Sequence, residues 1–437
     1  MRDLTSRLRD IVRRDHGGSE AAPAIRELTY VPDVGGLAVD AAEAAAKLGG
    51  TLVGTAHGAC IVIDRVWDAS HSHGRRAVGA CAPSADAPLA LFDSRAGNAA
   101  AWSNRVVFFD LETTGLSGGA GTLPFLAGCG WFEDGAFRVR QFFLPAPSGE
   151  RTMLEALAAV FEETSLLVTF NGRTFDVPLM ETRWAFHRSP AATDEVPHFD
   201  MLPTARRLWS RRELRDTPDR ASCTLSSLER AVVGFHRVGD VPGFEVPLRY
   251  FHFLRTGDTG AIEGVLEHNR HDLLSLAVVM SHALWMAQEG PDACREPSEQ
   301  MALGRLYERA GLIARAIDAF ERAAQGMDRE VRPHALARLA TMLGREDRHD
   351  EACVAWQGVI EHSRYQRGPM SALARRATEA LAIHHEHRAR DLATARTYAE
   401  TLRVHADART RQEAAHRLGR LDRKLSSKKD PGRGLDL

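Results

Sequence analysis

The sequence has little of what marks a secreted, membrane-spanning or zinc-ribbon protein. Its 437 residues include six cysteines, at positions 60, 81, 129, 223, 294 and 353, and none of them forms a Cys-x-x-Cys pair. This argues against a disulfide framework and a zinc ribbon, and favours a reducing cytosol. The stretch after Met1 lacks the apolar core of a secretory signal. No apolar run approaches the roughly 20 residues that cross a bilayer. We therefore expect a cytoplasmic protein without a membrane partner.

The chain also lacks a strong net charge of either sign. Its 56 basic and 58 acidic residues give a net charge of −2. Because no global field attracts nucleic acid, any phosphate-binding surface must be local. Hydrophobic residues make up 44% and charged residues 26% of the chain, which is ordinary for a globular protein. The length predicts two or three domains.

An acidic motif directly follows an apolar run. Residues 106–109 are Val-Val-Phe-Phe, which predicts a buried strand, and Asp110 and Glu112 come next. Alternate residues of a strand share a face, so both carboxylates point the same way. Adjacent carboxylates repel each other, and a divalent cation between them relieves the repulsion. The motif therefore predicts a metal site.

Two later motifs supply further acidic groups. Residues 166–170 predict a second buried strand, which leads to Asn171 and Asp176 in the order Asn-Gly-x-x-Phe-Asp. Residues 267–279 predict a helix that contains His268 and Asp272. These two residues are four apart and therefore share one helix face. The chain thus carries Asp with Glu, then Asp, then His with Asp.

That order resembles the DEDD exonucleases of the ribonuclease-H-like superfamily. The Gly-rich stretch 116–122, together with residues 141–144, 241–243 and 268–269, resembles the bacterial YprB-like family within it. The resemblance covers roughly residues 105–285. It implies an α/β ribonuclease-H-like domain with a mixed sheet flanked by helices. It also implies 3′–5′ exonuclease activity on nucleic acid, with a single-stranded end as the partner.

The resemblance assigns roles to five residues. It implies that Asp110, Glu112, Asp176 and Asp272 hold two Mg²⁺ or Mn²⁺ ions, with Asp110 bridging both. Two such ions about 3.5–4 Å apart can activate a water and stabilise the leaving oxygen of a phosphodiester. His268 falls at the position of the general base, and an unperturbed histidine pKa near 6.5 suits proton transfer near neutral pH. His268 stands four residues before Asp272, the spacing of the tyrosine branch, whereas the histidine branch has five.

Other residues are candidates for substrate binding. We expect Thr113, Thr114 and Gly115 to touch the terminal nucleotide, and Asn171 to orient either Asp176 or the substrate. A basic cluster with an aromatic residue suits a nucleic-acid backbone and a stacked base. The equal alternative is a solvated helix face. This cluster contains Arg206, Arg207, Arg211, Arg212 and Arg215 around Trp209.

The domain organisation follows from the same patterns. Strands are expected at 105–110, about 125–132 and about 136–143, then a helix at 150–163, all within an exonuclease domain at 105–290. Residues 1–104 receive no role, although helices are expected at 2–14 and 41–48 and a strand at 59–63. Residues 297–423 carry apolar positions at the spacing of tetratricopeptide repeats, which predicts a stacked helical array. Residues 424–437 are expected to be disordered.

The sequence therefore predicts a metal-dependent 3′–5′ exonuclease whose helical repeats bind a protein partner or extend the nucleic-acid track. Two alternatives remain open. One is a scaffold with a vestigial nuclease domain, whose main task is binding. The other is an endonuclease on the same fold. The sequence does not distinguish DNA from RNA.

Overall fold

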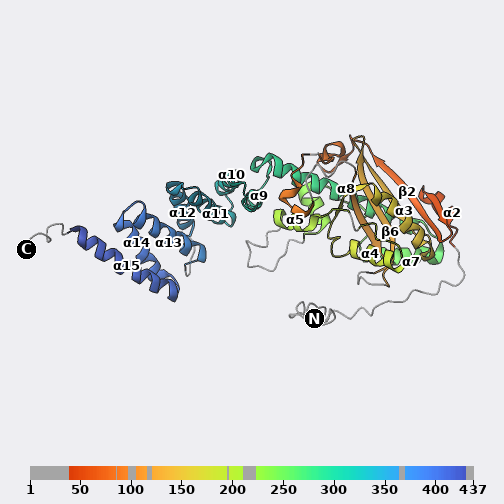
Figure 1. Ribbon diagram of the computed structural model, residues 1–437. Coiled ribbons are helices and arrows are strands. Elements are labelled where there is room, and N and C mark those ends of the chain that lie inside the picture. Colours follow the sequence, from red (N-terminus) through yellow and green to blue (C-terminus); the bar gives the residue numbers. More distant parts are fainter. Residues whose placement is uncertain are drawn as a thin grey trace, which may run out of the picture. The chain divides into compact units, whose positions relative to one another are not determined.

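The computed structural model describes residues 39–84, 86–96, 105–115, 121–193, 196–209, 223–363 and 370–429. Its centre is a seven-stranded sheet with the strand order β1-β2-β7-β6-β5-β8-β9 (Figure 1). The strands are β1 (Thr51–Thr55), β2 (Gly58–Trp67), β5 (Arg105–Thr113), β6 (Pro124–Glu133), β7 (Ala136–Phe143), β8 (Thr164–Thr169) and β9 (His198–Asp200). This mixed sheet is flanked by helices, as the sequence predicted.

The sheet combines an antiparallel half and a parallel half. Strands β1, β2, β7, β6 and β5 pair antiparallel, and Asp134-Gly135 forms the turn between β6 and β7 with both residues at positive φ. Helix α3 (Glu150–Glu162) then leads to β8, which pairs parallel with β5 and with β9. Because β5 and β8 run in the same direction, their carboxyl ends lie at the same edge. The segments after both strands therefore meet there.

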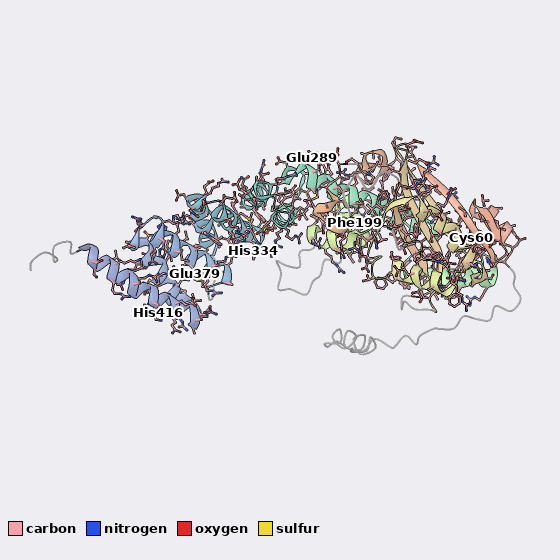
Figure 2. All side chains as sticks on the ribbon, viewed as in Figure 1. Cys60, Phe199, Glu289, His334, Glu379 and His416 are labelled. Carbon is pink, nitrogen blue, oxygen red and sulfur yellow. The ribbon has the colours of Figure 1, made fainter. Side chains whose placement is uncertain are left out.

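Alternate residues of the central strands enter two different cores. Phe108 and Val168 pack against the core that contains α5 (Met201–Trp209) and most of α8 (Gly260–Glu289). Val107 and Leu167 pack against the opposite core, built with α2 (Ala41–Leu48), α3, α4 (Asp176–Phe186) and α7 (Val246–Thr256). Figure 2 labels one residue of each core. Phe199 belongs to the core with α5 and α8, and Cys60 belongs to the core with α2, α3, α4 and α7. Burial on both faces explains the continuous apolar runs in the sequence.

The sheet begins earlier in the chain than the expected boundary at residue 105. Strand β2 pairs with β7 from Ile61↔Phe143 to Trp67↔Phe137, and β1 extends the sheet by one more strand. The predicted strand at 59–63 is part of β2, and the predicted helix at 41–48 is α2, which Asp40 caps. Residues 39–67 thus contribute to the fold, although nothing in their own residues indicates β7 as the partner strand. The helix expected at 2–14 lies outside the described residues.

The C-terminal part of the described chain is helical. Consecutive helices pack against each other, and the Tyr307 hydroxyl donates to the Ala287 carbonyl at 2.8 Å, which ties α9 to α8. Helix α15 includes residues 424–429, so the expectation of disorder was wrong for them, and residues 430–437 lie outside the described part. Within the described residues, no helix has the length and apolar character to cross a membrane. The helices are α9 (Pro297–Arg309), α10 (Ile313–Gln325), α11 (Val331–Arg345), α12 (His349–Ser363), α13 (Ala372–His387), α14 (Leu392–His405) and α15 (Ala408–Lys429).

Candidate metal centre

The carboxylates of the first motif emerge where β5 ends. Asp110 lies in register with Gly128 of β6, and Gly128 lies in register with Gln141 of β7. These three residues form a row across the sheet. Register pairs in neighbouring strands lie on one face, so the row presents its side chains to the same side as Asp110.

Helix α8 lies over this row through Asn269. The Asn269 Nδ2 donates to Asp110 Oδ2 at 2.8 Å, and Gln141 Nε2 donates to Asn269 Oδ1 at 2.8 Å and to the Leu266 carbonyl at 2.9 Å. A Cβ on Gly128 would lie 2.2 Å from Asn269 Oδ1, so only glycine permits this approach. The two amides therefore fix the position of α8 against the end of β5.

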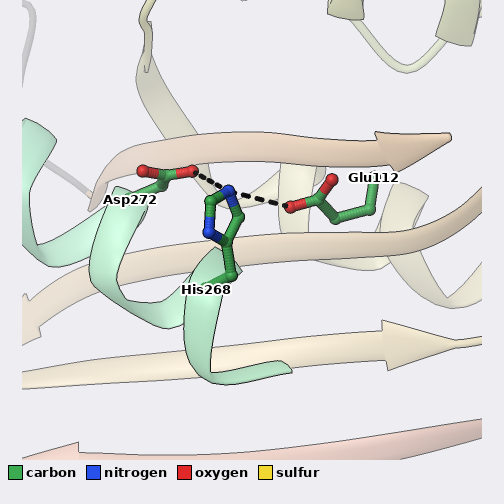
Figure 3. A group of neighbouring side chains, drawn as sticks. All are labelled: Glu112, His268 and Asp272. Atoms are coloured by element: carbon green, nitrogen blue, oxygen red, sulfur yellow. Dashed lines mark ion pairs between the residues drawn. The ribbon is translucent and has the colours of Figure 1, made fainter. Parts of the chain in front are cut away.

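Three side chains converge in front of the strand end (Figure 3). Glu112 comes from β5, and His268 and Asp272 come from successive turns of α8. The His268 Nε2 lies 3.5 Å from Asp272 Oδ2 and 4.0 Å from Glu112 Oε1. One ligand atom from each of these residues lies within 4.8 Å of the others. Their side chains are 13–18% exposed, so the group is both shielded and reachable.

Asp176 joins the cluster from the end of β8. It is the first residue of α4, and the preceding turn is held by Asp200, which accepts from the backbone N–H of Asn171 at 2.7 Å and of Arg173 at 3.3 Å. Asp200 also accepts from the Leu202 N–H at 3.0 Å, which caps the start of α5. Asp200 is 5% exposed, and its role is to brace the loop that carries Asp176.

The carboxylates perturb one another strongly. Burial, and then the negative charges of Asp272, Glu112 and Asp176, raise the pKa of Asp110 well above its usual range. Burial, then Asp272 and Asp176, raise the pKa of Glu112 in the same way. Burial is also the main cause that raises the pKa of Asp176 to about 7. Such mutual repulsion is the electrostatic signature of a site for a cation.

A buried arginine, Arg237, reaches the cluster from the segment before α7. Its guanidinium, whose side chain is 6% exposed, contacts Glu229 and Asp272 and lies 3.2 Å from Asp240 Oδ2. Against the opposing effect of burial, Glu229 and Asp272 raise the pKa of Arg237 further above its usual range. Arg237 thus compensates part of the negative charge on one side of the site. Arg237 is not apparent from the sequence, because a single arginine in an irregular segment carries no periodic signal.

Asp240 is a second residue of the site that is not apparent from the sequence. Its Oδ1 lies 2.7 Å from His268 Nδ1. Arg237 Nη1 lies 3.3 Å from the same nitrogen, but the shorter contact to a carboxylate favours a proton on Nδ1. In that tautomer Nε2 is unprotonated and faces Glu112 and Asp272. The one feature of the sequence that could have indicated Asp240 is its position directly before residues 241–243, which belong to the family resemblance.

The predicted substrate-binding residues have the following positions. The Thr113 Oγ1 donates to the Gly115 carbonyl at 2.8 Å, and Thr114 Oγ1 accepts from the Leu123 N–H at 3.0 Å, so both shape the turn after β5. Asn171 has a positive φ of 71°, and its Oδ1 accepts from Thr174, which stabilises the turn before α4. Residues 116–120 of the Gly-rich stretch lie outside the described part.

Arg206, Arg207 and Trp209 of the basic cluster lie on α5, and its other arginines lie outside the described residues. Arg206 and Arg207 are exposed, and Arg207 donates to the Phe92 carbonyl at 2.8 Å. Trp209 donates to Glu299 Oε1 at 3.0 Å and stacks on His282, so its ring is engaged by α9 and α8. This contact joins α5 to the helical region.

Comparison with known proteins agrees with the fold. Residues 107–284 match the family model described as the RNase_H superfamily. The chain is 32% identical over 328 residues to YprB of Bacillus subtilis (strain 168), covering 74% of this chain and 76% of that protein. The 328 aligned residues exceed the length of the segment that forms the sheet, so the match includes sequence outside that segment. The chain therefore belongs to the YprB-like family of the ribonuclease H superfamily.

Proposed function

We propose that the protein is a metal-dependent 3′–5′ exonuclease that hydrolyses phosphodiester bonds of DNA or RNA. The observation that carries this proposal is the convergence of Asp110, Glu112, Asp176 and Asp272, from three separated parts of the chain, beside a histidine held by Asp240. Membership of the ribonuclease H superfamily supports nuclease chemistry in general. The DEDD order of the motifs supports the exonuclease class.

The donor set fits a pair of hard divalent cations. Carboxylate oxygens are the ligands that Mg²⁺ and Mn²⁺ prefer. The raised pKa values of Asp110 and Glu112 report negative charge that the described side chains compensate only in part. Asp110, Glu112, Asp176 and Asp272 would hold the ions. When bound, these ions lower the pKa of a water and stabilise negative charge on the phosphate and the leaving oxygen.

The chain's own residues position the proton acceptor. His268 offers Nε2 toward the carboxylates because Asp240 binds Nδ1 from behind at 2.7 Å. In this role His268 accepts a proton from the attacking water, and Asp240 keeps the ring oriented during the transfer. Asn269 holds Asp110 through Nδ2, so the carboxylate keeps its second oxygen for other contacts. Asp240 thus orients the base His268, and Asn269 orients the central carboxylate of Asp110.

The alternative of a vestigial nuclease domain is less well supported. A domain retained only for binding gains nothing from carboxylates that raise one another's pKa, because their repulsion destabilises the fold. An endonuclease would use the same residues, and a substrate without free ends distinguishes it. We further propose that the C-terminal helices form a tetratricopeptide-type array.

The test is degradation of end-labelled single-stranded DNA and RNA of matched sequence with Mn²⁺, Mg²⁺ or EDTA. We expect a metal-dependent ladder that shortens from the 3′ end, and no cleavage by Asp110→Asn, which keeps the shape of the side chain. Cleavage of a circular strand at the same rate would indicate an endonuclease. Unchanged cleavage by Asp110→Asn, with its fold verified by circular dichroism, would contradict the proposal.

A further inference from the structure

An arginine-rich surface runs along the helices that follow the nuclease domain. It lies on α9, α11 and α13, where side chains three, four or seven residues apart share a face. On α11, His334, Arg338 and Arg345 fall on one such face, and His334 is labelled in Figure 2. We call this the basic face, and its members are Arg305, Arg309, His334, Arg338, Arg345 and Arg376.

Contacts between helices show that these residues adjoin one another. Glu308 of α9 accepts from Arg338 at 3.1 Å and from Arg345 at 3.4 Å. Arg376 of α13 donates to Thr341 of α11 at 3.0 Å. The basic face therefore continues across three helices.

The charges on this face lie close enough together to lower one another's pKa values. Glu308 is 15% exposed and serves two arginines at once. Burial, and then repulsion by Arg338 and Arg309, lowers the pKa of Arg305. Burial, and then Arg305 and Arg338, lowers the pKa of His334 in the same way. Like charges gathered so closely destabilise the surface unless an anion neutralises them.

The basic face connects to the candidate metal centre through α5. Burial, and then the charge of Arg207 on α5, lowers the pKa of Arg309, so these two residues are electrostatic neighbours. Helix α5 starts directly after Asp200, which braces the loop of Asp176, and ends at Trp209, which donates to Glu299 of α9. Arg207 therefore lies between the two regions.

We propose that the basic face binds the sugar–phosphate backbone of the substrate strand, at nucleotides away from the end that enters the metal centre. This inference rests on the proposed nuclease function. Guanidinium groups form bidentate pairs with phosphate. Neighbouring helix axes lie about 8–10 Å apart, so a flexible strand crossing α9, α11 and α13 meets a new arginine at each helix. An acidic peptide is the competing occupant, but continuity with the centre through Arg207 favours the nucleic acid.

The experiment compares two triple variants in the full-length Asp110→Asn protein, so that binding is measured without turnover. The first is Arg309→Gln, Arg338→Gln and Arg376→Gln, with one exposed residue from each of the three helices. The control is Arg322→Gln, Arg396→Gln and Arg403→Gln, which removes the same charge from exposed positions on α10 and α14. Fluorescence anisotropy follows labelled 30-nucleotide DNA and RNA across a range of salt concentrations.

We expect the first variant to lose about tenfold or more in affinity for the 30-mer. Its plot of log affinity against log salt should be shallower by about 2, since each phosphate contact on a single strand contributes about 0.7. The control should match the parent. Arg345→Gln alone, at a position 62% exposed, should give a smaller change in the same direction and guards against misfolding of the triple variant.

Three results would overturn the proposal: an unchanged affinity and salt slope, an equal loss in the control, or displacement of the 30-mer by polyglutamate as effectively as by unlabelled 30-mer.

The first triple variant with Asp110 intact is also assayed on a 6-nucleotide strand. We expect normal cleavage, because so short a strand does not reach the basic face. Failure of the unmodified protein to cleave the 6-mer would refute the proposed function, whereas the binding data test the basic face separately.

Discussion

Replacing Asp176 by Asn should stabilise the metal-free protein at neutral pH while removing most of its stabilisation by Mn²⁺. In the folded protein the pKa of Asp176 is raised to about 7, mainly by burial, from an ordinary value of 3.8. The folded state therefore holds a proton that the unfolded chain releases near pH 4. The contribution of Asp176 to the stability of the metal-free protein therefore falls as pH rises from about 4 to about 7, and it does not change further above about pH 7.

The size of the effect follows from the same shift. One pKa unit corresponds to about 1.4 kcal/mol, so a pKa of about 7 in place of 3.8 sets a ceiling of about 4 kcal/mol. Asp176 still reaches solvent, and the structure relaxes around a charge, so we expect a gain of about 1–2 kcal/mol for Asp176→Asn above pH 7. For a domain of this size that is a rise of about 2–8 °C in the melting temperature.

The assay is thermal unfolding, followed by circular dichroism, in EDTA or Mn²⁺ at several pH values between 4.5 and 8. Asp176→Asn should melt higher than the parent in EDTA at pH 8, and the difference should shrink toward pH 4.5. The parent should gain more from Mn²⁺, because a ligand that binds only the folded state stabilises it by mass action. Asp292→Asn, at a carboxylate 73% exposed, is the matched control. Equal melting of parent and variant at pH 8 in EDTA would refute the electrostatic account.

Three further changes test the residues that support the centre. Asp240→Asn should lower the single-turnover rate by about 10–100-fold with little change in KM, because Asp240 positions His268 without touching substrate. Asp240→Glu should recover part of the lost rate. An unchanged rate in Asp240→Asn would show that Asp240 has no part in the mechanism. Arg237→Gln should cost about 3–5 kcal/mol in chemical denaturation, since it leaves the 2%-exposed Glu229 without its cation. A loss below about 1 kcal/mol would contradict this account. Gly128→Ala should cost about 1–3 kcal/mol and most of the activity, because its Cβ would meet Asn269 at 2.2 Å. Gly344→Ala, with open space at its Cβ, should be neutral or stabilising, and equal losses in both would contradict this explanation.

The sequence predicted the parts of the fold that local patterns encode. The apolar runs before Asp110 and Asn171 are strands β5 and β8, and the strands expected at about 125–132 and about 136–143 are β6 and β7. The helix expected at 150–163 is α3, which spans Glu150–Glu162. Each of these features depends on residues close together in the chain. Propensity and periodicity therefore suffice to identify them.

Features that depend on contacts between residues far apart in the chain could not be predicted from the sequence. Strand β2 contains a recognisable apolar core, yet nothing in its own residues specifies β7, some 75 positions later, as its partner. Arg237 and Asp240 lie in an irregular segment, where neither a helical nor a strand period singles out a side chain. Their importance comes from the return of α8 across the sheet, which brings His268 within 2.7 Å of Asp240.

The pair of buried amides shows why even a correct set of carboxylates is an incomplete site. Gln141 and Asn269 are fully buried, and a buried amide is costly unless it is hydrogen-bonded. Here that requirement joins β7 to α8 and α8 to Asp110 through two contacts of 2.8 Å. The arrangement is possible only because Gly128 leaves room between them. The position of the central carboxylate is therefore set by two neutral side chains and a glycine, and recognising them from the sequence would require knowing that Asp110, Gly128 and Gln141 are register partners.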